Sequence, residues 1–115
     1  MDEVLFLYTT WPDAETAETF AAEAVAERLA ACANVLAPMR AIYRWKGAVE
    51  RAAEVPMILK ATTATAEPLK ALLLERHPYE VPCLVALPVV ADGSNPEFLA
   101  WIAEQTRSDQ ADAQG

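Results

Sequence analysis

Residues 39–62 read MRAIYRWKGAVERAAEVPMILKAT, and this stretch decides the fold because it holds two strand patterns joined by one turn. From Met39 to Trp45 the residues alternate with a period of two, which predicts a strand with one packed face. Lys46-Gly47 is typical of a turn, and residues 48–62 are predicted to return as the second strand. Pro56 interrupts that strand, and its missing N–H predicts a bulge or an unpaired edge.

A strand and a helix are predicted before this hairpin. Residues 4–10 form an apolar run that ends at Trp11-Pro12, as a buried strand does when it enters a turn. We interpret Asp13 as the N-cap of a helix, because apolar residues then recur at helical spacing. That spacing extends to Cys32, which we interpret as a small buried hydrophobe on the same helix.

A second helix, a strand and a third helix are predicted after the hairpin. The second helix is expected to begin from Thr65 as its N-cap, to accept Pro68 in its first turn and to stop before Pro78. Residues 83–89 are apolar almost throughout, which predicts a strand buried on both faces. Asn95 and Pro96 open the third helix. Its core side is expected to consist of Phe98, Leu99, Trp101 and Ile102.

The order strand, helix, strand, strand, helix, strand predicts an α/β (α+β) fold of ferredoxin-like βαββαβ type. We expect an antiparallel sheet with helices on one face, plus a C-terminal helix. Residues 1–107 are predicted to form a single domain and residues 108–115 a disordered acidic tail. This fold leaves the other sheet face and a long hairpin uncovered, so self-association is expected.

Charge and composition exclude several classes of partner. Nine basic and seventeen acidic side chains give a net charge of −8, which repels nucleic acid and anionic lipid and attracts cations. No apolar run approaches the roughly 20 residues of a membrane span, and no signal-peptide pattern is visible. Two cysteines far apart form no disulfide or zinc-knuckle pattern. We therefore predict a cytoplasmic protein.

Six motifs together resemble one known family, the CutA-type divalent-cation-tolerance proteins. They occur in the family's order, from about residue 3 to residue 105, and their co-occurrence is far more specific than any one of them. The motifs are Tyr8-Thr9-Thr10 with Pro12-Asp13, Glu27-Arg28-Leu29-Ala30-Ala31-Cys32, Tyr43-x-Trp45-x-Gly47, Ile58-Leu59-Lys60, His77-Pro78-Tyr79-Glu80-Val81-Pro82 and Ala86-Leu87-Pro88-Val89. The resemblance implies a homotrimer joined by the long hairpins, with Tyr43 and Trp45 at its interface, and a link to divalent cations, copper above all.

The resemblance does not carry over the whole copper site proposed for relatives. Those relatives use a cysteine at the end of the first strand and a histidine pair at the end of the second helix. Here the first position falls among Tyr8, Thr9 and Thr10, and the pair reads Arg76-His77, so His77 alone carries over.

Cys83 and His77 are our candidate ligands for copper or another soft divalent cation. A thiolate and an imidazole are a soft pair, and both residues flank the rigid segment between Pro78 and Pro82. Two alternatives remain open: His77 as a residue that suits the end of a helix dipole, and Cys83 as a core residue.

A pocket between subunits is the second candidate site. We expect it to include Thr9, Trp45, Glu54, Lys60 and Tyr79, together with His77. No GxSxG, P-loop or GxGxxG motif is present in the sequence, so we predict a protein that is not an enzyme. The rival to a metal-tolerance function is a signalling trimer that binds a small anionic effector, and the third reading is a purely structural assembly partner.

Overall fold

A strand followed by a capped helix opens the molecule, as the sequence predicts. In the computed structural model, which describes residues 3–107, β1 covers Val4–Trp11 and α1 covers Ala14–Ala26. The Asp13 carboxylate accepts a 2.7 Å hydrogen bond from the backbone N–H of Thr16, which satisfies a donor that the helix itself leaves unpaired. The acidic tail predicted for residues 108–115 lies outside the described residues.

The first helix ends earlier than its apolar pattern suggests, and this corrects the interpretation of Cys32. Arg28 adopts a left-handed φ of 61°, and the N–H of Leu29 bonds back to the Ala24 carbonyl, which closes the helix. Cys32 is the first residue of β2, Cys32–Val35, and pairs with Lys60. The prediction that Cys32 continues the helix was wrong, because the spacing of apolar residues does not show where the backbone leaves the helical conformation.

The central hairpin forms where the sequence places it. β3 covers Met39–Trp45 and β4 covers Ala48–Thr62. Lys46 and Gly47 both have positive φ, 48° and 81°, the combination found in type I′ hairpin turns. From Val35 to Met39 the chain takes four steps, whereas the β4 partners Met57 and Glu54 are three steps apart. The extra residue therefore lies between β2 and β3, within residues 36–38, and not in β4. Pro56 itself continues the regular pairing with Thr10 of β1 and accepts a hydrogen bond from the Leu36 N–H, so the bulge predicted at Pro56 is on the opposite side of the pairing.

The second half of the chain repeats the strand and helix order. α2 covers Thr63–Arg76, β5 covers Leu84–Pro88, a short 3-10 turn η1 covers Ala91–Gly93, and α3 covers Pro96–Gln105. The N-cap of α2 is Thr62, three residues before the predicted Thr65, whose hydroxyl instead accepts from the Thr62 backbone N–H. Pro68 therefore lies beyond the first turn. The predicted cap of α3 is confirmed, since Asn95 accepts from the N–H of Glu97.

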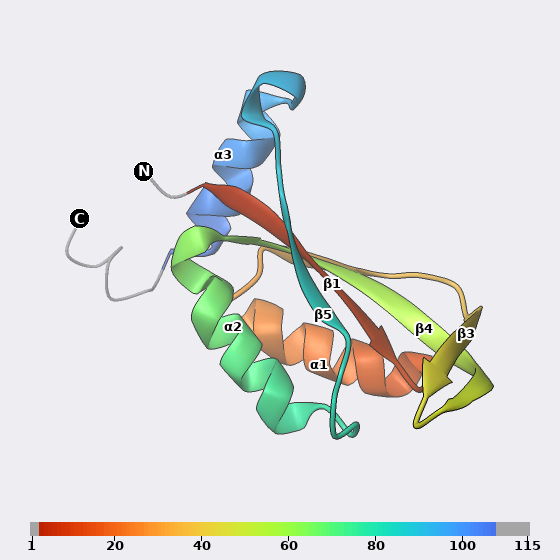
Figure 1. Cartoon of the computed structure of the whole chain (residues 1–115). Coiled ribbons are helices and arrows are strands. Elements are labelled where there is room, and N and C mark those ends of the chain that lie inside the picture. The colour runs from red at the N-terminus through yellow and green to blue at the C-terminus, as the bar shows by residue number, and fades with distance from the viewer. Residues whose placement is uncertain (1–2, 108–115) are drawn as a thin grey trace.

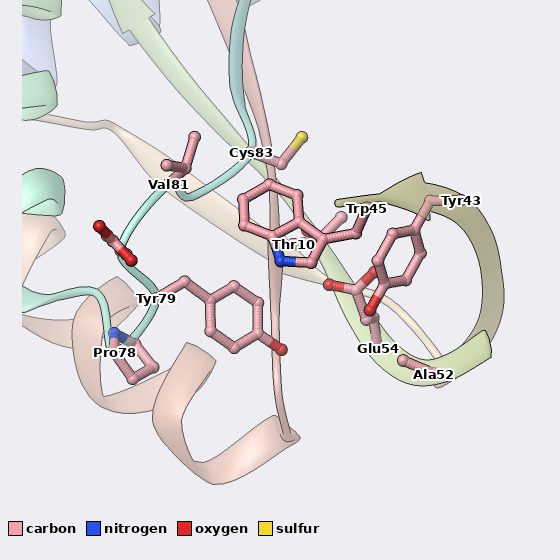
Figure 2. Close-up of a pocket in the computed structure, with 10 residues that line it drawn as sticks. Thr10, Tyr43, Trp45, Ala52, Glu54, Pro78, Tyr79, Val81 and Cys83 are labelled. Atoms are coloured by element: carbon pink, nitrogen blue, oxygen red, sulfur yellow. The ribbon is translucent and has the colours of Figure 1, made fainter. Parts of the chain in front are cut away.

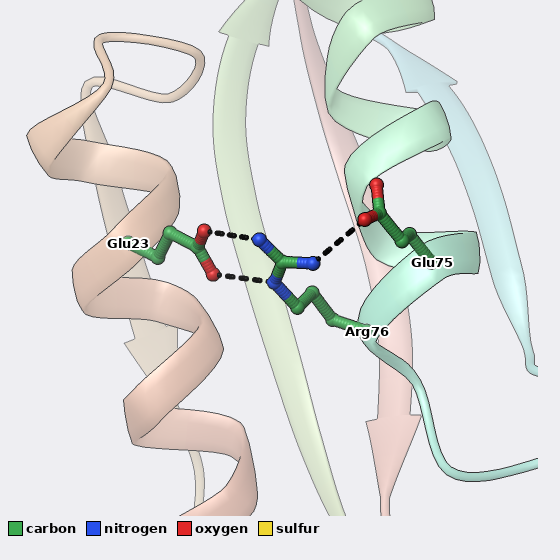
Figure 3. A network of polar contacts seen from close by, with 3 residues as sticks. All are labelled: Glu23, Glu75 and Arg76. Carbon is green, nitrogen blue, oxygen red and sulfur yellow. Dashed lines mark hydrogen bonds and ion pairs between the residues drawn. The ribbon is translucent and has the colours of Figure 1, made fainter.

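The sheet has the order β2-β4-β1-β5, with β3 paired to β4, and every pair is antiparallel. This is the predicted ferredoxin-like arrangement. α1 and α2 lie side by side against one face of the sheet (Figure 1). Arg76 of α2 joins the two helices through paired hydrogen bonds of 3.0 and 2.9 Å to Glu23 of α1 (Figure 3). The core between helices and sheet includes Leu7, Phe20, Met57, Leu59, Leu69 and Leu73.

The opposite face of the sheet carries apolar side chains with little cover. Residues directly across an antiparallel pair share a face, so Phe6 aligns with Lys60 and Leu87, and Tyr8 aligns with Ile58 and Val85. We call the set Phe6, Tyr8, Ile58, Val85 and Leu87 the open sheet face. Val85 and Leu87 are 49% and 45% exposed.

Among the described helices, α3 alone approaches the open sheet face, at one end of it. The Phe98 ring of α3 lies 5.3 Å from the Lys60 ammonium, and α3 stands at the end of the sheet away from the hairpin (Figure 1). Of the four residues predicted for its core side, Ile102 is fully buried, whereas Phe98 and Trp101 stack on each other at 5.7 Å and stay exposed. The apolar face of α3 is thus wider than the part of it that the single chain buries.

Candidate functional site

A pocket of about 560 Å³ lies between the β3–β4 hairpin and the loop that follows α2. The pairing of Met39 with Glu54 places alternate residues of both hairpin strands on one face, and this face supplies Tyr43, Trp45, Ala52 and Glu54 to the wall. The loop supplies Pro78, Tyr79, Glu80, Val81 and Cys83, and β1 supplies Thr10. Figure 2 shows the side chains of the hairpin and those of the loop facing one another across this space.

His77 holds the loop in place from behind the pocket. It is 7% exposed, and its Nδ1 accepts a 3.1 Å hydrogen bond from the Tyr79 backbone N–H. Nε2 lies 2.8 Å from the Thr10 carbonyl oxygen, so the neutral tautomer with its proton on Nε2 satisfies both bonds. The ring also packs on Trp11, with centroids 4.2 Å apart. His77 thereby ties the end of α2 to the end of β1.

This geometry gives no support to a metal site formed by His77 and Cys83. Both ring nitrogens of His77 are engaged by the backbone, and a nitrogen that accepts or donates such a bond has no lone pair available for a cation. Cys83 lines the pocket and His77 does not. Within residues 3–107, no three His, Cys, Asp or Glu side chains are grouped so that they could hold a metal ion.

Besides His77, two more of the residues expected in the pocket lie elsewhere. Thr9 is fully buried on the helix-covered face, where its hydroxyl donates a 2.7 Å hydrogen bond to the Cys83 carbonyl. Its neighbour Thr10 lines the pocket instead, because a shift of one residue along a strand changes the face. Lys60 shares the strand face of Glu54, but six residues separate them, about 20 Å at strand spacing. Its ammonium packs on the rings of Phe6 and Phe98.

Three predicted residues do come together in the pocket: Trp45, Glu54 and Tyr79. Tyr43, Glu80 and Val81 also line the pocket and were not predicted to do so, although Tyr43 follows from the same alternation that selects Trp45 and Ala52. The loop residues carry no such periodic signal. Their place in the wall depends on how His77 folds the loop against β1.

The pocket has a negative and aromatic character. Two carboxylates, Glu54 and Glu80, line it, and no lysine or arginine of residues 3–107 does. Burial raises the pKa of the Tyr79 hydroxyl, and the nearby Glu54 carboxylate raises it further, since ionisation would place a second negative charge beside the first. The site therefore favours cations over anions.

Comparison with known proteins matches this chain to one family over nearly its whole length. The family model of the CutA1 divalent ion tolerance protein matches residues 5–105. The divalent-cation tolerance protein CutA of Thermus thermophilus is 43% identical over 106 residues, which cover 92% of this chain and 99% of that protein. The corresponding protein of Pyrococcus horikoshii is 41% identical, over 90% of this chain and 99% of its own length.

Solved structures give the same fold. CutA1 from Shewanella sp. SIB1 superposes with a TM-score of 0.87 at 35% identity and covers 92% of this chain and 97% of its own. A protein from Archaeoglobus fulgidus, described as a periplasmic divalent cation tolerance protein CutA, superposes with a TM-score of 0.85 at 33% identity, over 90% and 99% of the two chains. In residues 3–107 of this chain, the helices are too short or too polar to cross a membrane.

Proposed function

The chain belongs to the CutA1 divalent ion tolerance protein family, and from this membership we propose that it contributes to divalent-cation tolerance as a cytoplasmic homotrimer without catalytic activity. The observation that supports assembly is the uncovered apolar surface of the single chain. It extends along the open sheet face and over the exposed Phe98 and Trp101 of α3. Contiguous apolar surface of this kind is typical of a protein interface.

The hairpin supplies the second part of the proposed interface. Its strands extend beyond the part of the sheet that α1 and α2 cover (Figure 1), and β3 pairs with β4 alone within the described chain. The far edge of β3 therefore presents unpaired backbone groups, which a neighbouring subunit would cover. The number of three subunits follows from the family resemblance. In a closed symmetric trimer each of the three hairpins would make the same contacts with a neighbouring subunit.

Charge guides the choice of ligand class within this function. Among the described residues that line the pocket, carboxylates and one thiol are present and basic side chains are not, which argues against the anionic effector of a signalling trimer. Cys83 is the remaining soft donor, and one thiolate makes a weak site for copper or zinc unless other chains add ligands. We therefore expect weak cation binding by a dissociated subunit.

Light scattering coupled to size exclusion tests the assembly. The expected mass is three times the 12.5 kDa of one chain. Leu87→Asp, on the open sheet face, should lower the mass, because it places a charge in the interface. Leu74→Asp is the matched control, since Leu74 is similarly exposed at 55% but lies on α2. A wild-type mass of one chain at micromolar concentration would refute the homotrimer.

The cation response is tested in cells and in solution. A strain that lacks the gene should grow less well than its parent at raised copper or zinc, and the gene should restore growth. In solution, a thermal-shift screen of metals against nucleotides compares the two ligand classes, because a ligand that binds only the native state raises the melting temperature. Equal growth of both strains under every cation would contradict the proposed role, whatever the oligomeric state.

A further inference from the structure

We propose that the pocket binds a small organic ammonium ion, held by the rings of Tyr43, Trp45 and Tyr79 and by the carboxylate of Glu54. This goes beyond cation tolerance: the named residues all belong to one chain, so the pocket exists in each subunit and borders the interface that we propose for the hairpin. The ligand class is an alkylated ammonium of about the size of choline.

The aromatic residues come from two elements that face each other. Tyr43 and Trp45 stand on one face of β3, two residues apart, and Tyr79 comes from the loop after α2. All three rings remain partly exposed in the pocket although each is large and apolar. Figure 2 shows the Trp45 and Tyr79 rings on one side of the Glu54 carboxylate and the Tyr43 ring on the other. Several ring faces around one space are the usual recognition device for alkylated ammonium ions.

A counter-charge is present at the same place. Glu54 is half-buried and takes part in no ion pair among residues 3–107. The Glu54 carboxylate raises the pKa of the Tyr79 hydroxyl across the pocket. The carboxylate and the Tyr79 ring are therefore close enough to contact one ligand. A partly buried carboxylate without a cationic partner attracts a positive group more strongly than an exposed one does.

The same residues suit an organic cation better than a bare metal ion. A divalent metal needs several nitrogen, oxygen or sulfur ligands to replace its water, and no such group is assembled in the described residues. An alkylated ammonium holds its water weakly, so ring faces and one carboxylate are sufficient. A pocket of about 560 Å³ is also far larger than a metal ion and falls in the range of small-molecule sites.

The chain itself places lysine ammonium groups on aromatic rings, in one case on the pocket residue Trp45. Lys60 lies 5.6 Å from the Phe6 ring and 5.3 Å from the Phe98 ring. Lys46, in the hairpin turn, lies 5.9 Å from the Trp45 ring but does not line the pocket. No lysine of residues 3–107 lines the pocket, so its interior is available to a cation from outside the chain.

Titration calorimetry with choline chloride tests the proposal on the full chain. The control ligand is 3,3-dimethyl-1-butanol, which has the shape of choline without its charge, and sodium chloride controls for ionic strength. Choline should bind about tenfold more tightly than the neutral analogue, since a desolvated ammonium over aromatic rings gains roughly that much. Equal affinity for the two ligands, or no heat with choline at millimolar concentration, would overturn the proposal.

Matched variants assign the binding to these residues. Glu54→Gln keeps the shape of the side chain and should weaken choline binding about tenfold, whereas Glu50→Gln, on the same hairpin face but outside the pocket wall, should leave it unchanged. Tyr79→Leu should weaken binding without altering the hairpin. Light scattering on each variant separates a loss of assembly from a loss of binding. Unchanged affinity in both Glu54→Gln and Tyr79→Leu would place the ligand elsewhere and refute the assignment.

Discussion

Replacing His77 with alanine distinguishes a structural histidine from a metal ligand. The substitution removes the hydrogen bonds to Thr10 and from Tyr79 and the ring contact with Trp11. Each buried hydrogen bond contributes about 1 kcal/mol net, and the aromatic contact contributes about 1 kcal/mol more. We expect His77→Ala to lower the free energy of unfolding by about 3 kcal/mol, a large part of the stability of a small domain.

Urea denaturation followed by tryptophan fluorescence measures this loss. With a slope of about 2 kcal/mol per molar urea, the midpoint should fall by about 1.5 M while the slope stays unchanged. Protein concentration is held constant, because the stability of an oligomer depends on it. His77→Gln is the matched variant: its amide N–H replaces the donor to Thr10 but not the acceptor for Tyr79, so its midpoint should lie between the other two.

The metal hypothesis predicts a different result for the same variants. If His77 binds a cation, the metal-free variants should unfold at the wild-type urea concentration and lose only the stabilisation that copper(I) or zinc adds. If His77 is structural, the metal-free stability falls and any shift produced by metal persists. An unchanged midpoint for metal-free His77→Ala would refute the structural role.

Three further outcomes follow from local contacts. Asp13→Ala should lower the melting temperature at neutral pH because α1 loses its cap. The hydrogen bond from the Thr16 N–H holds the pKa of the Asp13 carboxyl below its ordinary value, so the stabilisation by this carboxylate is complete at neutral pH and is lost as the pH falls through the lowered pKa. The melting curves of wild type and Asp13→Ala should therefore converge in acid. Glu23→Gln should reduce stability at low salt and less so at 1 M salt, since the pair with Arg76 is partly exposed; equal losses at both salt concentrations would contradict this reason. Gly47→Ala should destabilise the hairpin by about 1 kcal/mol, because its φ of 81° disfavours any residue with a Cβ, and light scattering should then show weaker assembly.

The candidate site was only partly predictable from the sequence. The alternation in residues 39–45 puts Trp45 on the hairpin face that lines the pocket, and Glu54 and Tyr79 line it too. Thr9 and Lys60 do not line this pocket of the single chain, for two different reasons. Strand periodicity gives the relative faces of residues but does not say which set turns toward the helices, and it ignores the distance along a long strand.

The sequence by itself determined the order of the elements apart from β2, the hairpin with its turn, and the caps at Asp13 and Asn95. These features depend on interactions between residues close together in the chain, so local spacing and backbone chemistry are sufficient to indicate them. Only the tertiary structure decided that Arg28 reverses the chain before Cys32, that His77 faces Thr10 and Trp11, and that three aromatic rings line one pocket with Glu54. The last two of these bring together residues from distant segments, and a side chain's partners across such distances are fixed by the packing of the whole sheet rather than by its neighbours in sequence.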